Sequence, residues 1–251
     1  MRRRTLVITD NVRLSSFFSD FIAGQDLCEV VGLACSAQAP AELLRNKIFE
    51  VIDVRRDSAR LCRDYELVVS AHCKQFFPKS LHEQVECINI HPGYNPETRG
   101  WFPQVWAITR GVNAGVTVHR IDGELDHGDI IDRFVVPVRI WDTSRTAYDR
   151  ILGAEIDWIR HNFHRLIEGD YSVSKPEGDG DLYTKADFSS LCRIELEQVG
   201  SFRNFYDRLR ALSFDGYRNA YFIDPESGAR IFLELRVVPE ADDANATDSH
   251  D

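Results

Sequence analysis

The chain has 251 residues, of which 43% are hydrophobic and 28% are charged, and its formal net charge is −10. This length allows one large domain or one domain with a small appendage, and the composition is that of an ordinary globular protein. The negative charge argues against a nucleic-acid partner, because binding a polyanion needs a basic face. A local group of arginines could still bind a small anion.

The six cysteines are scattered and no two have CxxC spacing, which is typical of free thiols in a reducing compartment and not of a zinc site or a disulfide framework. The basic start, MRRRTLVITD, is followed by an apolar run too short for a signal peptide. No run of about eighteen apolar residues occurs anywhere in the sequence. We therefore expect a cytoplasmic protein that does not span a membrane.

Short apolar runs rich in valine and isoleucine alternate with mixed segments over the first ninety residues. Each run is too short for a buried helix and is typical of a strand buried on both faces; the runs are residues 5–9, 30–35, 49–54, 67–71 and 85–90. Residues 12–23 and 41–47 between them have helical spacing of apolar side chains. This alternation predicts an α/β fold with a Rossmann-like, doubly wound, mostly parallel sheet.

No GxGxxG sequence follows the first predicted strand, so a nicotinamide dinucleotide is not expected. Ligands of such a sheet should bind at the carboxyl ends of its strands. Beyond Pro92 the pattern predicts a polar loop, a helical turn at 107–110, and strands at 115–121 and 130–138. The clearest helix spans residues 144–168 and can end at Gly169.

The composition divides the chain into a catalytic domain at 1–185, a small unit at 186–239 and an acidic tail at 240–251. A linker at 174–181 precedes the small unit. The small unit should contain a helix at 201–212 and a hairpin with strands at 220–223 and 230–238. The tail is poor in apolar residues, so we expect it to be disordered.

Two polar side chains stand at the end of the fifth predicted strand. Asn89 and His91 are one residue apart, so both point to the same face, and Pro92 then turns the chain out of the sheet. Such a strand end is where open α/β folds bind ligands. Alternatively, the two side chains only make hydrogen bonds within a turn.

An acidic turn lies between the strands at 115–121 and 130–138. It holds Asp122, Glu124, Asp126 and Asp129, and crowded carboxylates need a cationic or hydrogen-bonding partner, which His91 could be. A carboxylate beside an imidazole raises the imidazole pKa and fixes its tautomer, as acid–base catalysis requires. A solvated acidic loop is the alternative.

Three motifs in this order carry a resemblance to a known family: NIHPG, RGWFP, and GVTVH followed after three residues by GELDHGDII. Together they resemble the folate-dependent formyltransferases that act on glycinamide ribonucleotide, methionyl-tRNA or nucleotide sugars. That family shares an Asn-x-His-Pro motif and a later LDxG aspartate in a Rossmann-like domain. The motifs cover about residues 65–140, and the order of elements matches over most of 1–185.

The runs SAHCKQFFP and HPGYNPETRGWFPQVW are similar to the nucleotide-sugar branch. The purine and tRNA branches usually have Ser-Leu-Leu-Pro after His-Pro, where this chain has Gly-Tyr-Asn-Pro. The C-terminal hairpin resembles the small appendage of the sugar enzymes. The resemblance implies transfer of a formyl group from N10-formyltetrahydrofolate to a dTDP-linked amino dideoxy sugar, with dTDP-4-amino-4,6-dideoxyglucose as the expected acceptor. Such enzymes serve surface polysaccharide synthesis, including that of O-antigen and lipopolysaccharide.

The resemblance also implies roles for individual residues. Asn89 and His91, as an imidazolium, would donate hydrogen bonds to the oxyanion that forms on the formyl group, and Asp126 would keep His91 protonated and relay a proton. No metal is needed. The expected folate contacts are Lys74, Gln75, Phe76, Phe77, Thr117 and Asp122. The expected contacts to the sugar nucleotide are Tyr94, Arg99, Trp101, His119, Tyr217, Arg218 and Tyr221.

Several of these side chains have an ordinary alternative. Thr117, His119, Trp101 and either Phe76 or Phe77 could be core residues, and the aromatic residues of the C-terminal unit could form a dimer seam. Arg99 is suited to a pyrophosphate because its guanidinium forms paired hydrogen bonds. A homodimer built on the C-terminal unit is expected, since so small a unit cannot bury enough apolar surface alone.

Other functions remain open at this point. They are hydrolysis of formyltetrahydrofolate, formylation of glycinamide ribonucleotide, a metal-dependent hydrolase, and a folate- or nucleotide-binding module with a degenerate site. The metal hydrolase would use His91, His119, Asp126 and His127, but these residues lack the spacing of a known zinc motif.

Overall fold

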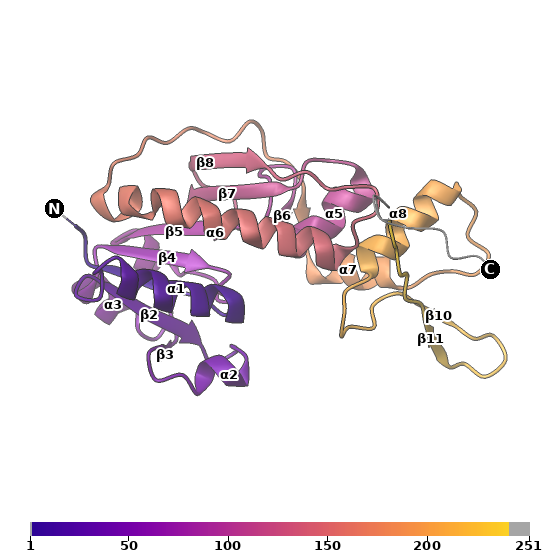
Figure 1. Cartoon of the computed structure of the whole chain (residues 1–251), viewed down its shortest axis with the longest axis horizontal. Coiled ribbons are helices and arrows are strands. Elements are labelled where there is room, and N and C mark those ends of the chain that lie inside the picture. Colours follow the sequence, from indigo (N-terminus) through magenta and orange to yellow (C-terminus); the bar gives the residue numbers. More distant parts are fainter. Residues whose placement is uncertain (1, 241–251) are drawn as a thin grey trace, which may run out of the picture.

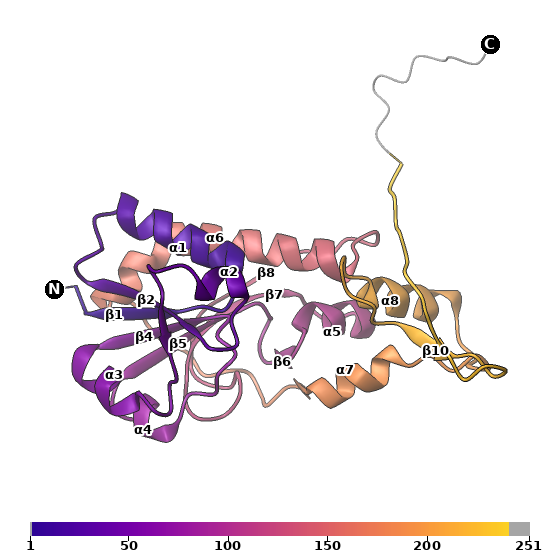
Figure 2. The same cartoon turned by 90° about the horizontal axis from the view of Figure 1, so that it is seen from below.

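The computed structural model describes residues 2–240 and contains a seven-stranded sheet with helices on both faces and a smaller unit at one end (Figures 1 and 2). The strands lie in the order β3-β2-β1-β4-β5-β7-β8. In chain order these strands are β1 (Thr5–Ile8), β2 (Val31–Ser36), β3 (Glu50–Ile52), β4 (Leu67–Ala71), β5 (Glu86–His91), β7 (Gly115–Arg120) and β8 (Ile130–Val135).

The first five strands pair in parallel, whereas β7 and β8 are antiparallel to their neighbours. The predicted α/β fold with a mostly parallel sheet is therefore confirmed. Antiparallel pairing of β5 with β7 returns the chain to the carboxyl end of β5 after a connection at residues 92–114. Its first part, residues 92–102, is called the functional loop below.

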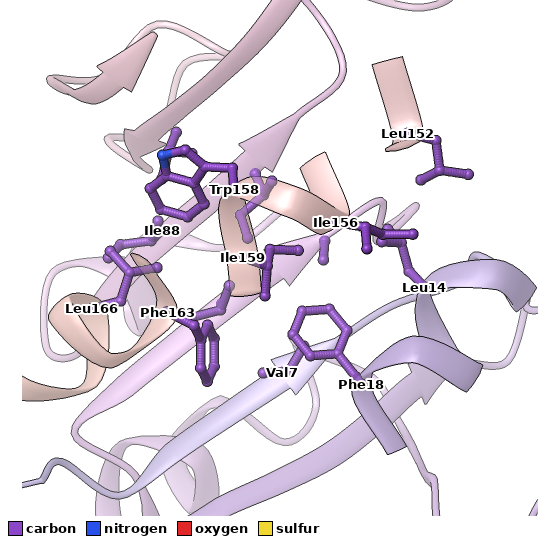
Figure 3. Close-up of a cluster of buried hydrophobic side chains, with 14 of the residues drawn as sticks. Val7, Leu14, Phe18, Ile88, Leu152, Ile156, Trp158, Ile159, Phe163 and Leu166 are labelled. Atoms are coloured by element: carbon purple, nitrogen blue, oxygen red, sulfur yellow. The ribbon is translucent and has the colours of Figure 1, made fainter. Parts of the chain in front are cut away.

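Helices cover both faces of the sheet (Figure 2). The helices α1 (Val12–Gly24) and α6 (Ser144–Glu168) lie on one face, and α3 (Ser58–Asp64) and α4 (Lys79–His82) lie on the opposite face. Because side chains alternate along a strand, Val7 of β1 packs toward α1 and α6 while Leu6 and Ile8 pack toward α3 and α4. Buried aromatic and aliphatic side chains fill the space beneath α6 (Figure 3), where Phe18 of α1 meets Phe163 edge-on.

The ends of the longest helix follow its sequence signals. Thr143 forms a capping box with Thr146 before α6, and Gly169 ends the helix with φ +73°, a conformation that glycine adopts without strain. The prediction of this helix is confirmed to the residue. The helix α1 is capped by Asn11, whose side-chain oxygen accepts a hydrogen bond from Leu14 N.

The predicted bounds are less accurate where the elements are short. The helix expected at 41–47 is the four-residue α2 (Ala41–Leu44), and the strand expected at 49–54 is only β3. The sequence reading missed α3, α4 and α7 (Lys185–Cys192), since elements of four to eight residues show too little periodicity. It also missed the two-residue pair of β6 (Arg99–Gly100) and β9 (Leu182–Tyr183), which forms between distant segments.

The C-terminal unit lies beyond one end of the sheet (Figure 1) and contains α7, α8 (Phe202–Leu212) and the hairpin of β10 (Tyr221–Ile223) and β11 (Arg230–Phe232). The second hairpin strand is shorter than predicted, because pairing ends at Phe232. The helix α8 packs on α5 (Pro103–Arg110) and α6. The buried guanidinium of Arg210 donates to the carbonyl oxygens of Asp142 (2.8 Å) and Arg139 (3.2 Å), which joins the unit to the start of α6.

The predicted acidic tail lies outside the described residues, except for Glu240. Within residues 2–240, no helix is both long enough and apolar enough to cross a membrane.

Candidate active site

The end of β5 and the neighbouring strand β7 bring the polar side chains of the site together. In the antiparallel register Asn89 stands opposite His119, and His91 stands opposite Thr117. Asn89 donates hydrogen bonds from its amide nitrogen to Asp126 Oδ1 (2.9 Å) and toward His119 Nε2 (3.3 Å). His119 Nδ1 donates to the carbonyl oxygen of Arg120 (2.8 Å), so its Nε2 is left as an acceptor in the neutral ring.

Asp126 lies in the turn between β7 and β8, and its side chain is almost fully buried. Besides the bond from Asn89, its carboxylate accepts a hydrogen bond from Gly100 N at Oδ2 (3.0 Å). The same oxygen lies 3.5 Å from His91 Nδ1, and Oδ1 lies 3.6 Å from His119 Nε2. Asn89, His91 and Asp126 therefore form one contiguous group, as the acidic-turn hypothesis required.

The environment keeps the Asp126 carboxyl ionised. Burial by itself would raise its pKa, but His91, His119 and the Gly100 N–H favour the charged form and hold the pKa well below the usual range. This carboxylate is thus the fixed negative charge of the site. Asn89 and Gly100 supply the hydrogen bonds that make its burial tolerable.

The structure modifies the expected state of His91. Burial lowers the pKa of this imidazole, and although the Asp126 carboxylate opposes that shift, the net direction is downward. The neutral ring is therefore the resting form near neutral pH, instead of the imidazolium predicted from sequence. If the ring gains a proton, its nitrogens face two acceptors, Asp126 Oδ2 and the carbonyl oxygen of Thr98 (3.3 Å).

The loop after His91 folds back over the imidazole. A side chain at Gly93 would clash with the His91 ring and with the carbonyl oxygen of Thr98, so only glycine fits there. Thr98 itself binds the backbone N–H of Tyr94 (2.9 Å) through its hydroxyl oxygen. The Tyr94 ring is half-buried beneath the guanidinium of Arg133, 4.6 Å from the ring centre, so part of this predicted substrate contact packs on β8.

Arg99 does not occupy the position expected of a pyrophosphate ligand. Its guanidinium is buried and donates twice to the carbonyl oxygen of Leu125 (3.0 and 2.9 Å) and once to that of Asp179 (2.6 Å). These three donors are used within the protein, so the phosphate role of Arg99 stays a prediction that its contacts do not favour. Arg99 instead joins the acidic turn, by hydrogen bonds, to the segment that leads into the C-terminal unit.

Among the predicted folate contacts, only some side chains are available to a ligand. Phe76 is half-exposed and Lys74 is exposed on the loop after β4, whereas Phe77 is buried in the core toward α3 and α4. The Gln75 amide binds the backbone of Ile52 and Val54 and so joins two strand ends. A core role for Phe77, the alternative noted above, is the one observed.

The remaining folate candidates are Thr117 on β7 and Asp122 in the acidic turn. Thr117 is buried, and its hydroxyl group is used within the loop. Asp122 is exposed and accepts a hydrogen bond from His127 Nδ1 (2.8 Å). His127 thus faces away from the buried group, and among residues 2–240 no group of three or more histidine, cysteine or acidic side chains is arranged to hold a metal ion.

The predicted sugar-nucleotide contacts in the C-terminal unit fall into two groups. Tyr221 and Arg218 pack against Phe232 within the hairpin unit. Tyr217 is largely exposed and meets Phe214 edge-on, which in turn approaches Tyr148 of α6. Of the predicted C-terminal contacts, Tyr217 is thus the one connected to the carboxyl edge of the sheet.

Trp101 is partly buried, and the Lys185 ammonium group lies 4.0 Å from the centre of its ring. This contact joins the functional loop to the first residue of α7. Phe102, the next residue, stacks at 4.3 Å on Phe188 of the same helix. The aromatic pair therefore helps to hold the loop against the C-terminal unit.

A second polar cluster, which the sequence reading missed, lies one strand away from His91. His72 follows β4 with φ +63°, and its Nε2 lies 2.8 Å from the fully buried carboxylate of Glu155 on α6. Its Nδ1 lies 3.1 Å from the Tyr148 hydroxyl, which also accepts a hydrogen bond from Asn11 (2.8 Å). No motif or spacing relates these four residues in the sequence, so only the fold reveals them.

Comparison with known proteins places the chain in a family. Residues 21–162, more than half of the chain, match the model of the formyl transferase family, and residues 187–239 match the N-formyltransferase dimerization C-terminal domain. The chain belongs to the formyl transferase family and is an N-formyltransferase.

Relatives within this family are similar over almost their whole length. The dTDP-4-amino-4,6-dideoxyglucose formyltransferase of Mycobacterium bovis is 39% identical over 235 residues, which cover 94% of this chain and 97% of the relative. A sugar N-formyltransferase from a Shewanella species has a TM-score of 0.89 at 37% identity, covering 94% of this chain and 98% of its own. A 4-N formyltransferase from Francisella tularensis has a TM-score of 0.88 at 33% identity, covering 95% and 99%.

The contacts of Arg99 lead to a prediction that distinguishes a structural role of this residue from phosphate binding. Arg99→Ala should lower the free energy of unfolding by about 1.5–3 kcal/mol, the usual value of a hydrogen bond to a charged group, because the carbonyl oxygens of Leu125 and Asp179 lose their donors. Urea denaturation measures this loss. Arg56→Ala, at an exposed residue that pairs only with its neighbour Asp57, is the control and should change stability little. Unchanged stability, with a raised KM for an anionic substrate alone, would restore the phosphate role.

Proposed function

We propose that this enzyme transfers the formyl group of N10-formyltetrahydrofolate to the amine of a dTDP-linked amino dideoxy sugar, and that the acceptor is dTDP-4-amino-4,6-dideoxyglucose. The observation that carries the proposal is the buried group of Asn89, His91 and Asp126, in a chain 39% identical along nearly its full length to a formyltransferase with that acceptor in its name. The product would serve surface polysaccharide synthesis. Six free cysteines, none in a disulfide, fit a reducing cytoplasm.

The side chains of Asn89, His91 and Asp126 suit acyl transfer to an amine. N10-formyltetrahydrofolate would supply a formyl carbon that an amine can attack directly. The half-exposed Phe76 ring on the loop after β4 offers an apolar face to a flat heterocycle. The role of the protein is then to orient the two substrates, accept the amine proton and stabilise negative charge on the formyl oxygen.

His91 is suited to the proton transfer because its pKa is lowered. A neutral imidazole can accept the proton that the attacking amine loses, and the resulting imidazolium is stabilised by Asp126 Oδ2 and the Thr98 carbonyl oxygen. The proton then passes to N10 of the folate as the bond between N10 and the formyl carbon breaks, which releases tetrahydrofolate. Asp126 stays ionised throughout, so it acts as a fixed counter-charge. This assignment differs from the sequence-based expectation in two respects. His91 starts neutral and acts as a base instead of donating to the oxyanion, and Asp126 does not itself relay a proton.

Asn89 is the proposed donor to the formyl oxygen. Its amide nitrogen now faces Asp126 at 2.9 Å and His119 at 3.3 Å, and the second contact is the longer one. Exchanging the His119 contact for the formyl oxygen would keep Asp126 in place while presenting one N–H to the developing charge. Removing such a donor typically raises the barrier by about 2.7–4 kcal/mol.

The acceptor and the catalytic group can be tested together. The wild-type protein should add a formyl group to dTDP-4-amino-4,6-dideoxyglucose, measured by mass spectrometry, in preference to 3-amino isomers, glycinamide ribonucleotide and methionyl-tRNA. His91→Asn and Asp126→Asn should each lower kcat by about 10²–10⁴-fold, since each removes a group that handles the proton or its charge. Circular dichroism checks that the fold is intact.

A matched control lies in the same turn. Asp129 pairs with exposed Lys175 at the surface, so Asp129→Asn should leave kcat within about twofold, as expected of a surface ion pair. Release of formate without any acceptor would instead indicate a hydrolase. Full activity of either catalytic variant would contradict the assignment of the group.

We also propose that the enzyme is a homodimer, with residues 1–185 as the catalytic domain and 186–239 as the dimerisation unit. The matched dimerization domain supports this, and so does the apolar surface that the unit exposes: Leu196, Val199, Phe202, Tyr217, Ile231, Phe232 and Val238. The two-stranded hairpin cannot be stable in water on its own, and its free edges can pair with another chain.

Ile231→Asp should convert the dimer to a monomer, because a charge placed in an apolar interface is left unpaired when the chains associate. Light scattering across a range of protein concentrations measures the mass. Ile48→Asp introduces the same charge at an exposed isoleucine of the catalytic domain and should leave the dimer intact. A dimer unaffected by the change in the hairpin would place the interface elsewhere.

A further inference from the structure

Asn95 is a buried polar residue of the functional loop that lies against Asp126. Its side chain is only 2% exposed, and its amide nitrogen Nδ2 donates a hydrogen bond to the backbone carbonyl oxygen of Asp126 (2.9 Å). Its backbone N–H donates to Thr117 Oγ1 (2.9 Å), and that hydroxyl donates to the Gly93 carbonyl oxygen (2.7 Å). The acidic turn, strand β7 and the loop after His91 therefore meet at this one residue.

The orientation of the Asn95 amide is determined by its surroundings. The carbonyl oxygen of Asp126 can only accept, so the amino end of the amide must face it. The other end, Oδ1, is buried and has no hydrogen-bond partner within residues 2–240. An apolar side chain of similar size would avoid an unpaired buried oxygen. The amide is thus used for a single purpose, which is donation to Asp126.

The hydrogen bond from Asn95 supports the backbone of Asp126, which has an unfavourable conformation. Asp126 has φ +52°, a left-handed conformation that costs energy in any residue with a side chain and persists only where neighbouring groups impose it. Asn89 and Gly100 hold the carboxylate of Asp126, but Asn95 holds its main chain. Loss of this bond would free the peptide to rotate and carry the carboxylate away from His91.

We infer that Asn95 is a positioning residue for formyl transfer, which sets the Asp126 carboxylate against His91 by binding the Asp126 main chain. The inference rests on the proposed function, because it gives Asp126 its role. Asn95 itself touches neither substrate in this assignment. Its loss should therefore lower kcat while leaving the KM values for both substrates nearly unchanged.

The first test uses Asn95→Leu, which keeps the volume and removes the donor. It should lower kcat by about 10–100-fold, as loss of a group that supports a catalytic residue typically does, with both KM values within about threefold. Glu97→Gln is the control; Glu97 lies on the same loop but binds only Asn113 at the surface, so kcat should stay within about twofold. A wild-type kcat for Asn95→Leu would overturn the inference.

The second test, Asn95→Asp, has a pH signature that a merely structural role lacks. An ionised carboxylate cannot donate to the Asp126 carbonyl oxygen and would repel it, whereas the protonated acid can donate in place of the amide. The ratio of the variant's kcat to that of the wild type should therefore rise as the pH falls from about 8 to about 6, because burial raises the pKa of the new carboxyl. A ratio that does not change with pH would contradict the inference even if Asn95→Leu failed to fold.

A third readout needs no turnover, so it separates this inference from the proposed function. The Asp126 carboxylate raises the pKa of His91, and a displaced carboxylate raises it less. NMR titration of His91 should thus show a lower pKa in Asn95→Leu than in the wild type. An unchanged His91 pKa would overturn the positioning role. A wild-type enzyme that formylates no dTDP-amino sugar would instead overturn the proposed acceptor and leave the His91 titration as the test of Asn95.

Discussion

The site depends on the burial of one ionised carboxylate, that of Asp126. A carboxylate is costly to remove from water unless hydrogen bonds compensate for it. Here Asn89 and the Gly100 N–H bind the two oxygens, and His91 and His119 lie within 3.6 Å. These groups come from β5, β6 and β7, so the sheet, the loop after β5 and the acidic turn must all be in place before the charge can be buried.

The electrostatic consequence is that the two ionisable groups, His91 and Asp126, carry different charges and play different parts. Burial lowers the pKa of His91 and by itself would raise the pKa of Asp126. The pKa of Asp126 stays low because the interaction with His91 and the contacts with His119 and the Gly100 N–H favour its charged form. A neutral base beside a permanent negative charge can take a proton and be stabilised as soon as it has done so. The arrangement needs no carboxylic acid to titrate near neutral pH.

The sequence predicted the parts of the molecule that depend on local patterns. The parallel strands and α6 follow from runs of valine and isoleucine and from capping residues, and strand alternation placed Asn89 and His91 on one face. The contacts of Arg99 were not predicted, because its partners Leu125 and Asp179 are distant in sequence. His72 and Glu155 were missed for the same reason, since 83 residues separate them.

The contacts of Arg99 also relate the catalytic group to the C-terminal unit. Strand β9 lies immediately before α7, and it pairs with β6, whose Gly100 N–H binds the Asp126 carboxylate. The segment that leads into the small unit therefore supports the wall of the active site, and Trp101 and Phe102 extend that support to α7 through Lys185 and Phe188. A displacement of α7 would act on Gly100 through a two-residue ladder, which has few hydrogen bonds to resist it. The segment that leads into the small unit is thus connected, through β9 and the Gly100 N–H, to the Asp126 carboxylate.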